Sequence, residues 1–235
     1  MKKWLARWLG RLPPLAAQQQ QRLNAWQALP HAVLHKPFSS TRCVVVDVET
    51  SGLNLLQDRL ISIGAVAVVN GHIALGDSFA VVLQQPDASG KDNILLHGIS
   101  GAAQTGGVPA ADALLAFLDY LGKDALIAFH VTFDQTMIRR ALRQYLGLTF
   151  NHPWLDMAYV MPALYPALAA NFRALDDWLA HFAIRNDAQH NALADALVTA
   201  QLFQIALTRA RKKNIADFAA MRDLEQAQRW VHGEN

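Results

Sequence analysis

The chain has 235 residues, of which 52% are hydrophobic and 17% are charged, and its formal net charge at pH 7 is +2. This length predicts one α/β domain with short extensions, large enough to bury a core. The single cysteine excludes a disulfide framework and a zinc site of paired cysteine and histidine ligands, and it predicts a reducing compartment, the cytoplasm. The small net charge gives no argument for nucleic-acid binding by itself.

Residues 1–36 predict a helical extension ahead of the main domain. Apolar side chains share one helical face and cations lie toward the other; the apolar residues are Trp4, Leu5, Trp8, Leu9 and Leu12, and the cations are Lys2, Lys3, Arg7 and Arg11. Three interpretations stay open: this face packs on the chain's own domain, binds a protein partner, or contacts a membrane surface. The segment has no long apolar core and no cleavage site, so a secretory signal is not expected.

The main domain is expected at residues 37–209, and its first strand, at 43–49, ends in two carboxylates. The run Val44-Val45-Val46-Asp47-Val48-Glu49-Thr50 is β-branched and uncharged until Asp47, which is typical of a buried strand. Side chains alternate along a strand, so Asp47 and Glu49 point to the same side, close enough to repel each other. A cation between them would relieve that repulsion, although the pattern alone is also compatible with chance.

The elements that follow predict a hairpin and then alternating helices and strands. Residues 60–69 are apolar enough for a second strand, and Asn70-Gly71 indicates a tight turn into an antiparallel third strand at 73–83. The remaining expected elements are a loop-rich connection with a short helix at 85–107, a helix at 109–121, a fourth strand at 125–129 and a short fifth strand at 154–156. This order predicts an α/β fold with a mixed five-stranded sheet flanked by helices.

Two further segments carry candidate functional residues. The fourth strand runs into a loop, and Asp134 is expected to open a helix over 135–146, where the plain interpretation is a helix N-cap. Later in the chain, His190 is expected at the start of another helix, with Asp195 about one turn further in. A histidine at a helix start is commonly a cap or a surface residue. Asp195 is harder to explain so, because burying an unpaired carboxylate among alanines and leucines is costly.

In order and spacing, these segments resemble the exonuclease family with an Asp-Glu-Asp-Asp-His signature. Members include the proofreading epsilon subunit of bacterial DNA polymerase III, oligoribonuclease and ribonuclease T. The first family motif has the form D-x-E-T-[TS]-G-L, which residues 47–53 match at every position, and the third has the form H-x-A-x-x-D-A, which residues 190–196 match. The resemblance covers about residues 42–207 and implies a ribonuclease-H-like fold.

The second family motif, H-N-x-x-F-D, is matched only in part. Phe133 and Asp134 are in place, whereas Phe129 and His130 stand where the family usually has histidine and asparagine. The tripeptide that begins at His97, followed by a serine, resembles a His-Gly-Ile-Thr element found between the first two motifs of the family.

The resemblance implies a metal-dependent 3′–5′ exonuclease that releases nucleoside 5′-monophosphates from the 3′ end of single-stranded nucleic acid, with DNA favoured. Two Mg²⁺ ions, replaceable by Mn²⁺, would serve as cofactors, and no small-molecule organic cofactor is expected. Asp47 would bridge both ions, Glu49 and Asp195 would complete one, and Asp134 would hold the other through water. His190 would be the general base, since the ordinary imidazole pKa of about 6.5 suits that task at neutral pH.

Four residues are expected to contact the substrate: Thr50, His97, His130 and Phe133. For His130 two interpretations stay open, because it could contact the phosphate or terminal sugar, or replace asparagine by packing against Phe129. The alternatives to a DNA exonuclease are an exoribonuclease of the same family and a non-catalytic relative that binds nucleic acid or a polymerase. Residues 210–235 predict a C-terminal helical extension, whose amphipathic helix is expected at 215–231.

Overall fold

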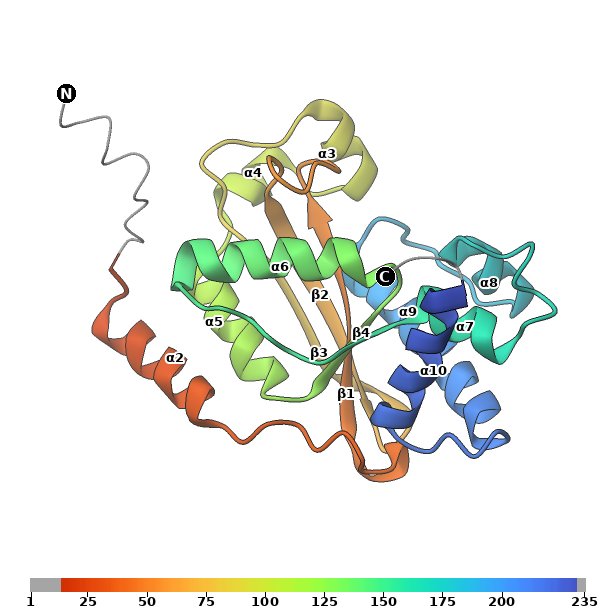
Figure 1. Ribbon diagram of the computed structural model, residues 1–235. Coiled ribbons are helices and arrows are strands. Elements are labelled where there is room, and N and C mark those ends of the chain that lie inside the picture. The colour runs from red at the N-terminus through yellow and green to blue at the C-terminus, as the bar shows by residue number, and fades with distance from the viewer. Residues whose placement is uncertain (1–13, 232–235) are drawn as a thin grey trace.

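A computed structural model describes residues 14–231, which form a five-stranded sheet with helices on both faces (Figure 1). The strands are β1 (Arg42–Thr50), β2 (Leu60–Val69), β3 (His72–Val82), β4 (Ala125–Ala128) and β5 (Trp154–Asp156), and their order across the sheet is β3-β2-β1-β4-β5. β1–β2 and β2–β3 are antiparallel, whereas β1–β4 and β4–β5 are parallel. The predicted mixed five-stranded sheet is therefore confirmed, and its layout is ribonuclease-H-like.

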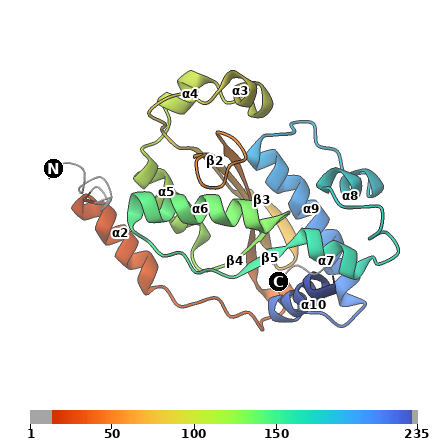
Figure 2. The same cartoon turned by 45° about the horizontal axis from the view of Figure 1, so that its top comes forward.

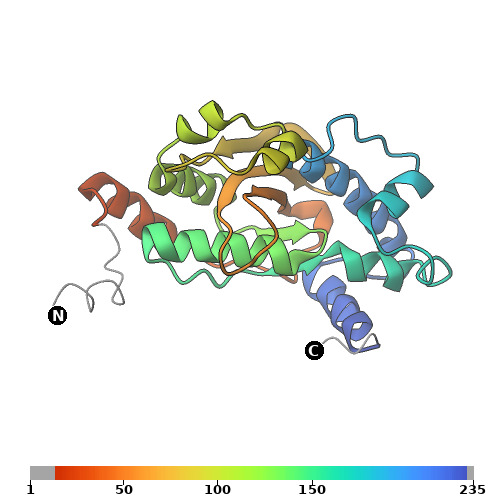
Figure 3. The same ribbon diagram turned by 90° about the horizontal axis from the view of Figure 1, so that it is seen from above.

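The helices divide between the two faces of the sheet. One face is covered by α5 (Ala110–Leu121) and α6 (Val131–Leu146), with α2 (Ala17–Ala28) packed on α5. The other face is covered by α7 (Met157–Leu164), α8 (Leu175–His181), α9 (Ala192–Arg211) and α10 (Phe218–Val231). Figure 3 shows the first group, in red and green, on one side of the strands and the second, in teal and blue, on the other.

The alternation of side chains along β1 decides which face receives its carboxylates. Val44, Val46 and Val48 belong to the core under α5 and α6, whereas Cys43 and Val45 belong to the core under α9. Asp47 and Glu49 have the parity of the second set, so they project on the α9 side of the strand. The sequence predicted that the two carboxylates share a side, and the sheet shows which helix they meet.

Most predicted elements appear within one or two residues of their expected bounds. The Asn70-Gly71 turn has positive φ at both residues, 54° and 81°, as the tight hairpin requires. The 85–107 connection contains two short helices rather than one, α3 (Lys91–His97) and α4 (Gly101–Thr105), and both lie beyond the end of the sheet toward which β1 runs (Figure 2).

The helix that carries Asp134 starts earlier than the sequence predicted. Helix α6 begins at Val131, so Asp134 lies in its first turn and is not the N-cap. The expected start was wrong because the first helical N–H groups are capped from another strand. The carboxylate of Asp156, at the end of β5, accepts hydrogen bonds from the N–H groups of His130 at 2.9 Å and Val131 at 3.1 Å. A cap supplied so far along the chain leaves no local sequence signal.

Both segments expected as extensions pack against the domain. On α2, Trp26 is buried and donates a hydrogen bond from Nε1 to the carbonyl of Gly122, and Arg22 pairs with Asp119 of α5. The predicted tryptophan face of residues 1–13 lies outside the described residues, so its three interpretations stay predictions. At the other end, α10 buries Phe218 in the core on the α9 side. Between residues 14 and 231, no helix combines the length and apolarity that crossing a membrane would need.

Candidate metal centre

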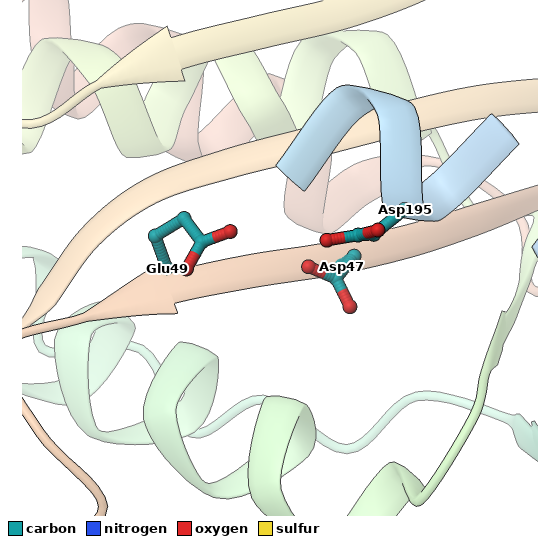
Figure 4. A group of neighbouring side chains, drawn as sticks. All are labelled: Asp47, Glu49 and Asp195. Atoms are coloured by element: carbon teal, nitrogen blue, oxygen red, sulfur yellow. The ribbon is translucent and has the colours of Figure 1, made fainter. Parts of the chain in front are cut away.

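Three carboxylates from two elements meet near the carboxyl end of β1. Asp47 and Glu49 lie on the strand, and Asp195 reaches them from the first turn of α9 (Figure 4). One oxygen of each side chain lies within 4.8 Å of the chosen oxygens of the other two. Glu49 is buried, while Asp47 and Asp195 are partly exposed, so the group opens to solvent on one side. The structure thus brings together residues that are almost 150 positions apart in the chain.

Gly64 of β2 allows α9 to come this close to the sheet. It lies opposite Asp47 in the β1–β2 ladder, and a β-carbon at this position would overlap the backbone of Ala192 and Leu193 at the start of α9. Because glycine has no side chain, the helix begins directly on the strand. The motifs did not point to Gly64, although a single glycine within an apolar strand is a known signal of close backbone approach.

The start of α9 holds Asp195 in place and exposes His190. Asn191 is the N-cap, and its side chain accepts a hydrogen bond from the N–H of Ala194. The Asp195 carboxylate accepts a hydrogen bond from Asn186 Nδ2 at 2.5 Å, and the nearby backbone N–H of His190 opposes the rise of its pKa on burial. His190 adopts a left-handed conformation with φ of 61°, and its side chain is exposed. This turn leaves the imidazole in solvent, close enough for its charge to act on Asp195.

Asp134 lies beside this group without being one of its three members. β4 pairs with β1 only as far as Val45, so the later part of β1 has an open edge on that side. Asp134, 5% exposed, approaches the backbone N–H of Val48 there from the first turn of α6. Burial raises its pKa to about 8, and this N–H opposes the rise. The Asp134 carboxylate is therefore placed where its charge acts on two carboxylates of the cluster, Asp47 and Glu49.

The electrostatics of the cluster favour protons or cations. Burial, followed by the charges of Asp134, Asp195 and Glu49, raises the pKa of Asp47 well above its usual range. Burial and the charges of Asp195 and Asp134 raise the pKa of Glu49 to about 8. Within residues 14–231, no lysine or arginine forms an ion pair with any of these four carboxylates.

The donor set of the cluster fits a hard divalent cation. All four side chains are carboxylates, which offer only oxygen atoms as metal ligands. Mg²⁺ and Mn²⁺ prefer oxygen ligands. A cation at this position would also neutralise charges that the described part of the chain leaves uncompensated. The residues present therefore fit the divalent metal that the sequence motifs implied.

Two of the predicted substrate-contacting residues make internal bonds at this end of the sheet. Thr50 Oγ1 donates to the carbonyl of Gly52 at 2.7 Å, which shapes the turn that follows β1. His97 is 4% exposed, and its Nδ1 accepts a hydrogen bond from the N–H of Ile99 at 3.0 Å. Burial lowers the pKa of His97, so its ring is held neutral. Contact of either side chain with substrate stays a prediction.

The other two predicted contacts lie at the start of α6. His130 is exposed with φ of 63°, and its ring packs edge-on against Phe129 with centroids 4.9 Å apart. This contact matches the structural interpretation of His130, while a contact with substrate stays a prediction. Phe133 is partly buried against the core under α5 and α6.

Of two hollows in the structure, one adjoins the cluster and the other lies far from it. One, of about 190 Å³, lies between β2, β3 and the start of α9, and Ile99 and Leu193 are among its lining residues. It adjoins the cluster because Ser62, which also lines it, is the ladder partner of Glu49. The other, of about 370 Å³, lies at the opposite end of the sheet beside Arg42 and Ala125, and none of the predicted site residues lines it.

Comparison with known protein sequences matches this chain to one family and to polymerase subunits. The model of an exonuclease family matches residues 44–203. The chain is 26% identical over 188 residues to the PolC-type DNA polymerase III of Thermotoga petrophila, covering 80% of this chain and 13% of that protein. It is 26% identical over 184 residues to the epsilon subunit of DNA polymerase III from Aquifex aeolicus, covering 78% and 89%. The chain thus spans a small part of the PolC-type relatives and most of the epsilon subunit.

Comparison with solved structures finds the same fold in other nucleases. E. coli exonuclease I in complex with a dT13 oligonucleotide superposes with a TM-score of 0.61 at 19% identity, covering 74% of this chain and 42% of that one. Exonuclease X in complex with 5′ overhanging duplex DNA superposes with a TM-score of 0.60 at 18% identity, covering 78% and 99%. At these identities the likeness concerns the fold, which agrees with the ribonuclease-H-like sheet described above.

Proposed function

Because the chain belongs to the exonuclease family that its residues 44–203 match, we propose that it is a metal-dependent 3′–5′ exonuclease acting on single-stranded DNA. Hydrolysis would release nucleoside 5′-monophosphates from the 3′ end. One observation carries the proposal: four carboxylates gather near the end of β1 with no lysine or arginine paired to them among the described residues, and an exposed histidine lies beside them. This arrangement suits hydrolysis of a phosphodiester assisted by divalent cations.

In the proposed mechanism the carboxylates bind the metal and His190 transfers a proton. Asp47, Glu49 and Asp195 would hold Mg²⁺ together with Asp134, and Mn²⁺ would replace it. When bound, the ions supply charge neutralisation for the phosphate and the leaving oxygen. His190 would accept a proton from the attacking water, and the nearby Asp195 carboxylate would stabilise the imidazolium that forms. Asn186 contributes by fixing the orientation of Asp195 through its 2.5 Å hydrogen bond.

DNA is the preferred substrate in this proposal because of the relatives. Those with sequence similarity include DNA polymerase III proteins, and the structural neighbours include nucleases solved with DNA. The buried free cysteine, Cys43, agrees with a reducing compartment, and we place the protein in the cytoplasm on that basis.

The test is digestion of matched single-stranded DNA and RNA oligonucleotides, labelled at either end, with Mg²⁺ and then with EDTA. We expect 5′-labelled DNA to shorten stepwise and 3′-labelled DNA to release a mononucleotide at once, both stopping with EDTA. The Asp47→Ala protein, purified in the same way, controls for contaminating nucleases. Faster digestion of RNA would replace DNA by RNA as substrate. Binding without cleavage of either would support a non-catalytic relative and overturn the proposal.

A further inference from the structure

Asp156 is a buried carboxylate whose bonds connect three parts of the fold. It lies at the end of β5, and its side chain is 2% exposed. Its Oδ1 accepts hydrogen bonds from the N–H groups of His130 at 2.9 Å and Ala158 at 3.0 Å. Its Oδ2 accepts from the N–H of Val131 at 3.1 Å and from Arg229 Nη2 at 2.9 Å. Each oxygen therefore accepts two hydrogen bonds, and α10 supplies the arginine that forms an ion pair with Asp156.

Arg229 is held in this position from several sides. Its Nε donates to Glu225 Oε1 at 2.8 Å, one turn earlier on α10. Its guanidinium lies 4.0 Å from the centre of the Tyr159 ring on α7. A guanidinium fixed by a carboxylate, a ring and its own helix loses little further freedom when it binds Asp156. The contact is thus a specific, preorganised link between α10 and the end of β5.

The two N–H groups bound by Asp156 define where α6 begins. The first N–H groups of a helix have no partner inside the helix, so whatever accepts them sets the direction of its first turn. His130, in the left-handed conformation, and Val131 form this start, and Asp134 follows within the same turn. The place of the Asp134 carboxylate beside Asp47 therefore depends on how Asp156 is held.

We propose that Arg229 is a positioning residue for the metal centre: through Asp156 it fixes the start of α6 and hence the place of Asp134. The part of this inference that concerns metal binding rests on the proposed function. It gives α10, which lies outside the matched residues 44–203, a part in the site. Without Arg229, Asp156 would be a buried carboxylate with no cation, a state that proteins relieve by protonation or by admitting water. Either change weakens its hold on the two N–H groups.

The test compares Arg229→Gln with two other variants. Arg229→Lys keeps the charge, so its amide exchange and Mn²⁺ affinity should lie between those of Arg229→Gln and those of the wild type. Arg22→Gln is the matched control, because it breaks the ion pair with Asp119, at 2.5 Å, between α2 and α5. We measure hydrogen exchange of the amides at 129–134, Mn²⁺ affinity by calorimetry, and the Mg²⁺ concentration for half-maximal cleavage. Arg229→Gln should raise exchange at residues 130 and 131 and lower Mn²⁺ affinity about 10-fold, as loss of outer partners of metal ligands commonly does. Arg22→Gln should change neither.

The outcomes separate this inference from the proposed function. If Arg229→Gln lowers thermal stability but leaves exchange at 130 and 131 and Mn²⁺ affinity at wild-type values, Arg229 is only structural and the inference is overturned. A wild-type protein that binds no Mn²⁺ and cleaves nothing would overturn the proposed function and the part of this inference that concerns the metal. Amide exchange would still decide whether Arg229 fixes the start of α6. Should Arg229→Gln fail to fold, Asp156→Asn combined with Arg229→Gln removes both charges of this ion pair. This variant should show the same rise in exchange, and wild-type exchange in it would contradict the inference.

Discussion

Glu49, the next-to-last residue of β1, and Asp156, the last residue of β5, are both buried, yet their neighbours differ in kind. Asp156 accepts three backbone N–H groups and one guanidinium, whereas Glu49 faces Asp47 and Asp195. Burial raises the pKa of both carboxylates, but Arg229 opposes the rise at Asp156, while the charges of Asp195 and Asp134 increase it at Glu49.

Among the described residues, the protein pairs Asp156 with a cation of its own and leaves Glu49 without one. The chain places a cation beside Asp156, where the carboxylate serves the structure. It places none of its lysines or arginines, within the described residues, in an ion pair with the cluster. Isolated ionised carboxylates are costly to bury, so an arrangement of this kind is stable at neutral pH only with protons or external cations.

Asp47→Ala should give the largest effect and the sharpest contrast. Removing the carboxylate on which the charges of Asp134, Asp195 and Glu49 all act should reduce oligonucleotide hydrolysis below about 1% of the wild-type rate, because the metal supplies most of the charge stabilisation. The metal-free protein should melt at the same temperature or higher, since repulsion within the cluster is relieved. Steady-state cleavage and calorimetric melting in EDTA measure the two effects.

Asp156→Ala is the corresponding change at the carboxylate that is paired with Arg229. It leaves three backbone N–H groups without their acceptor and leaves Arg229 paired with Glu225 alone, so it should lower the free energy of unfolding by about 3–5 kcal/mol. If Asp47→Ala destabilises the metal-free protein as much as Asp156→Ala does, the cluster is a structural network and the contrast fails.

His190→Ala should lower kcat by about 10²–10⁴ with little change in KM, the range for a positioned acid–base group. The exposed ring makes no contribution to the core, so melting should stay near the wild-type value. If His190 is the general base, the acid limb of the pH–rate profile should also disappear. An acid limb that persists in the variant would assign it to water bound to the metal rather than to His190.

Gly64→Ala tests whether the close approach of α9 builds the cluster. The new β-carbon would overlap the backbone at Ala192, so either the helix start moves away or the strand bends. We expect a loss of about 1–3 kcal/mol in unfolding free energy, together with a fall in cleavage rate larger than this destabilisation would explain. The matched control is Gly76→Ala in β3, where a β-carbon meets nothing within 4 Å. Equal, small effects of both changes would show that α9 tolerates displacement.

The sequence predicted the sheet almost completely because its signals are local. The apolar run before Asp47, the Asn70-Gly71 turn and the short strand at 154–156 each lie within a few residues, and each appears where expected. The shared side of Asp47 and Glu49 follows from the alternation of a strand alone. The approach of Asp195 was implied by family resemblance, since nothing local to α9 specifies its distance from β1.

What the sequence could not reveal depends on contacts between distant segments. The start of α6 was misplaced because its cap, Asp156, is 25 residues away in the chain. Arg229 lies 73 residues beyond Asp156, so no spacing rule connects them. Gly64 carried a signal, a glycine inside an apolar strand, but its partner is the backbone of a helix that begins much later.

The stability of the metal-free protein should fall as pH rises from about 6.5 to 8. The folded-state pKa of Glu49 is raised to about 8, far above its unfolded value, so the folded protein holds a proton that the unfolded chain has lost. Each pH unit in this window then costs up to about 1.4 kcal/mol per such group, or about 2 kcal/mol over the range. Burial lowers the pKa of His152 to about 4, and this makes stability rise with pH. That rise occurs below about pH 6.5 and so lies outside this range.

Melting in EDTA at several pH values measures this slope. Glu49→Gln should make it shallower, because one group with a raised pKa is lost, and saturating Mg²⁺ should abolish or reverse it in the wild type, because the cation replaces the protons. By contrast, Asp119→Asn, which alters the partly exposed surface pair with Arg22, should leave the slope unchanged. A wild-type protein whose stability does not fall over this range would show that the cluster is compensated by groups other than metal ions.

His130→Asn, at the residue just before α6, should give the smallest effect. Its N–H is bound to Asp156, and its backbone has a φ of 63°, a conformation that asparagine adopts more readily than most residues. The change should therefore leave stability unchanged or raise it by less than about 1 kcal/mol, with the lost ring contact to Phe129 opposing the gain. If the exposed imidazole also touches substrate, KM or the ratio of DNA to RNA cleavage will change while melting does not. Unaltered kinetics would assign His130 to the helix start alone, and a clear loss of stability would mean that its ring, rather than its backbone conformation, is what the turn requires.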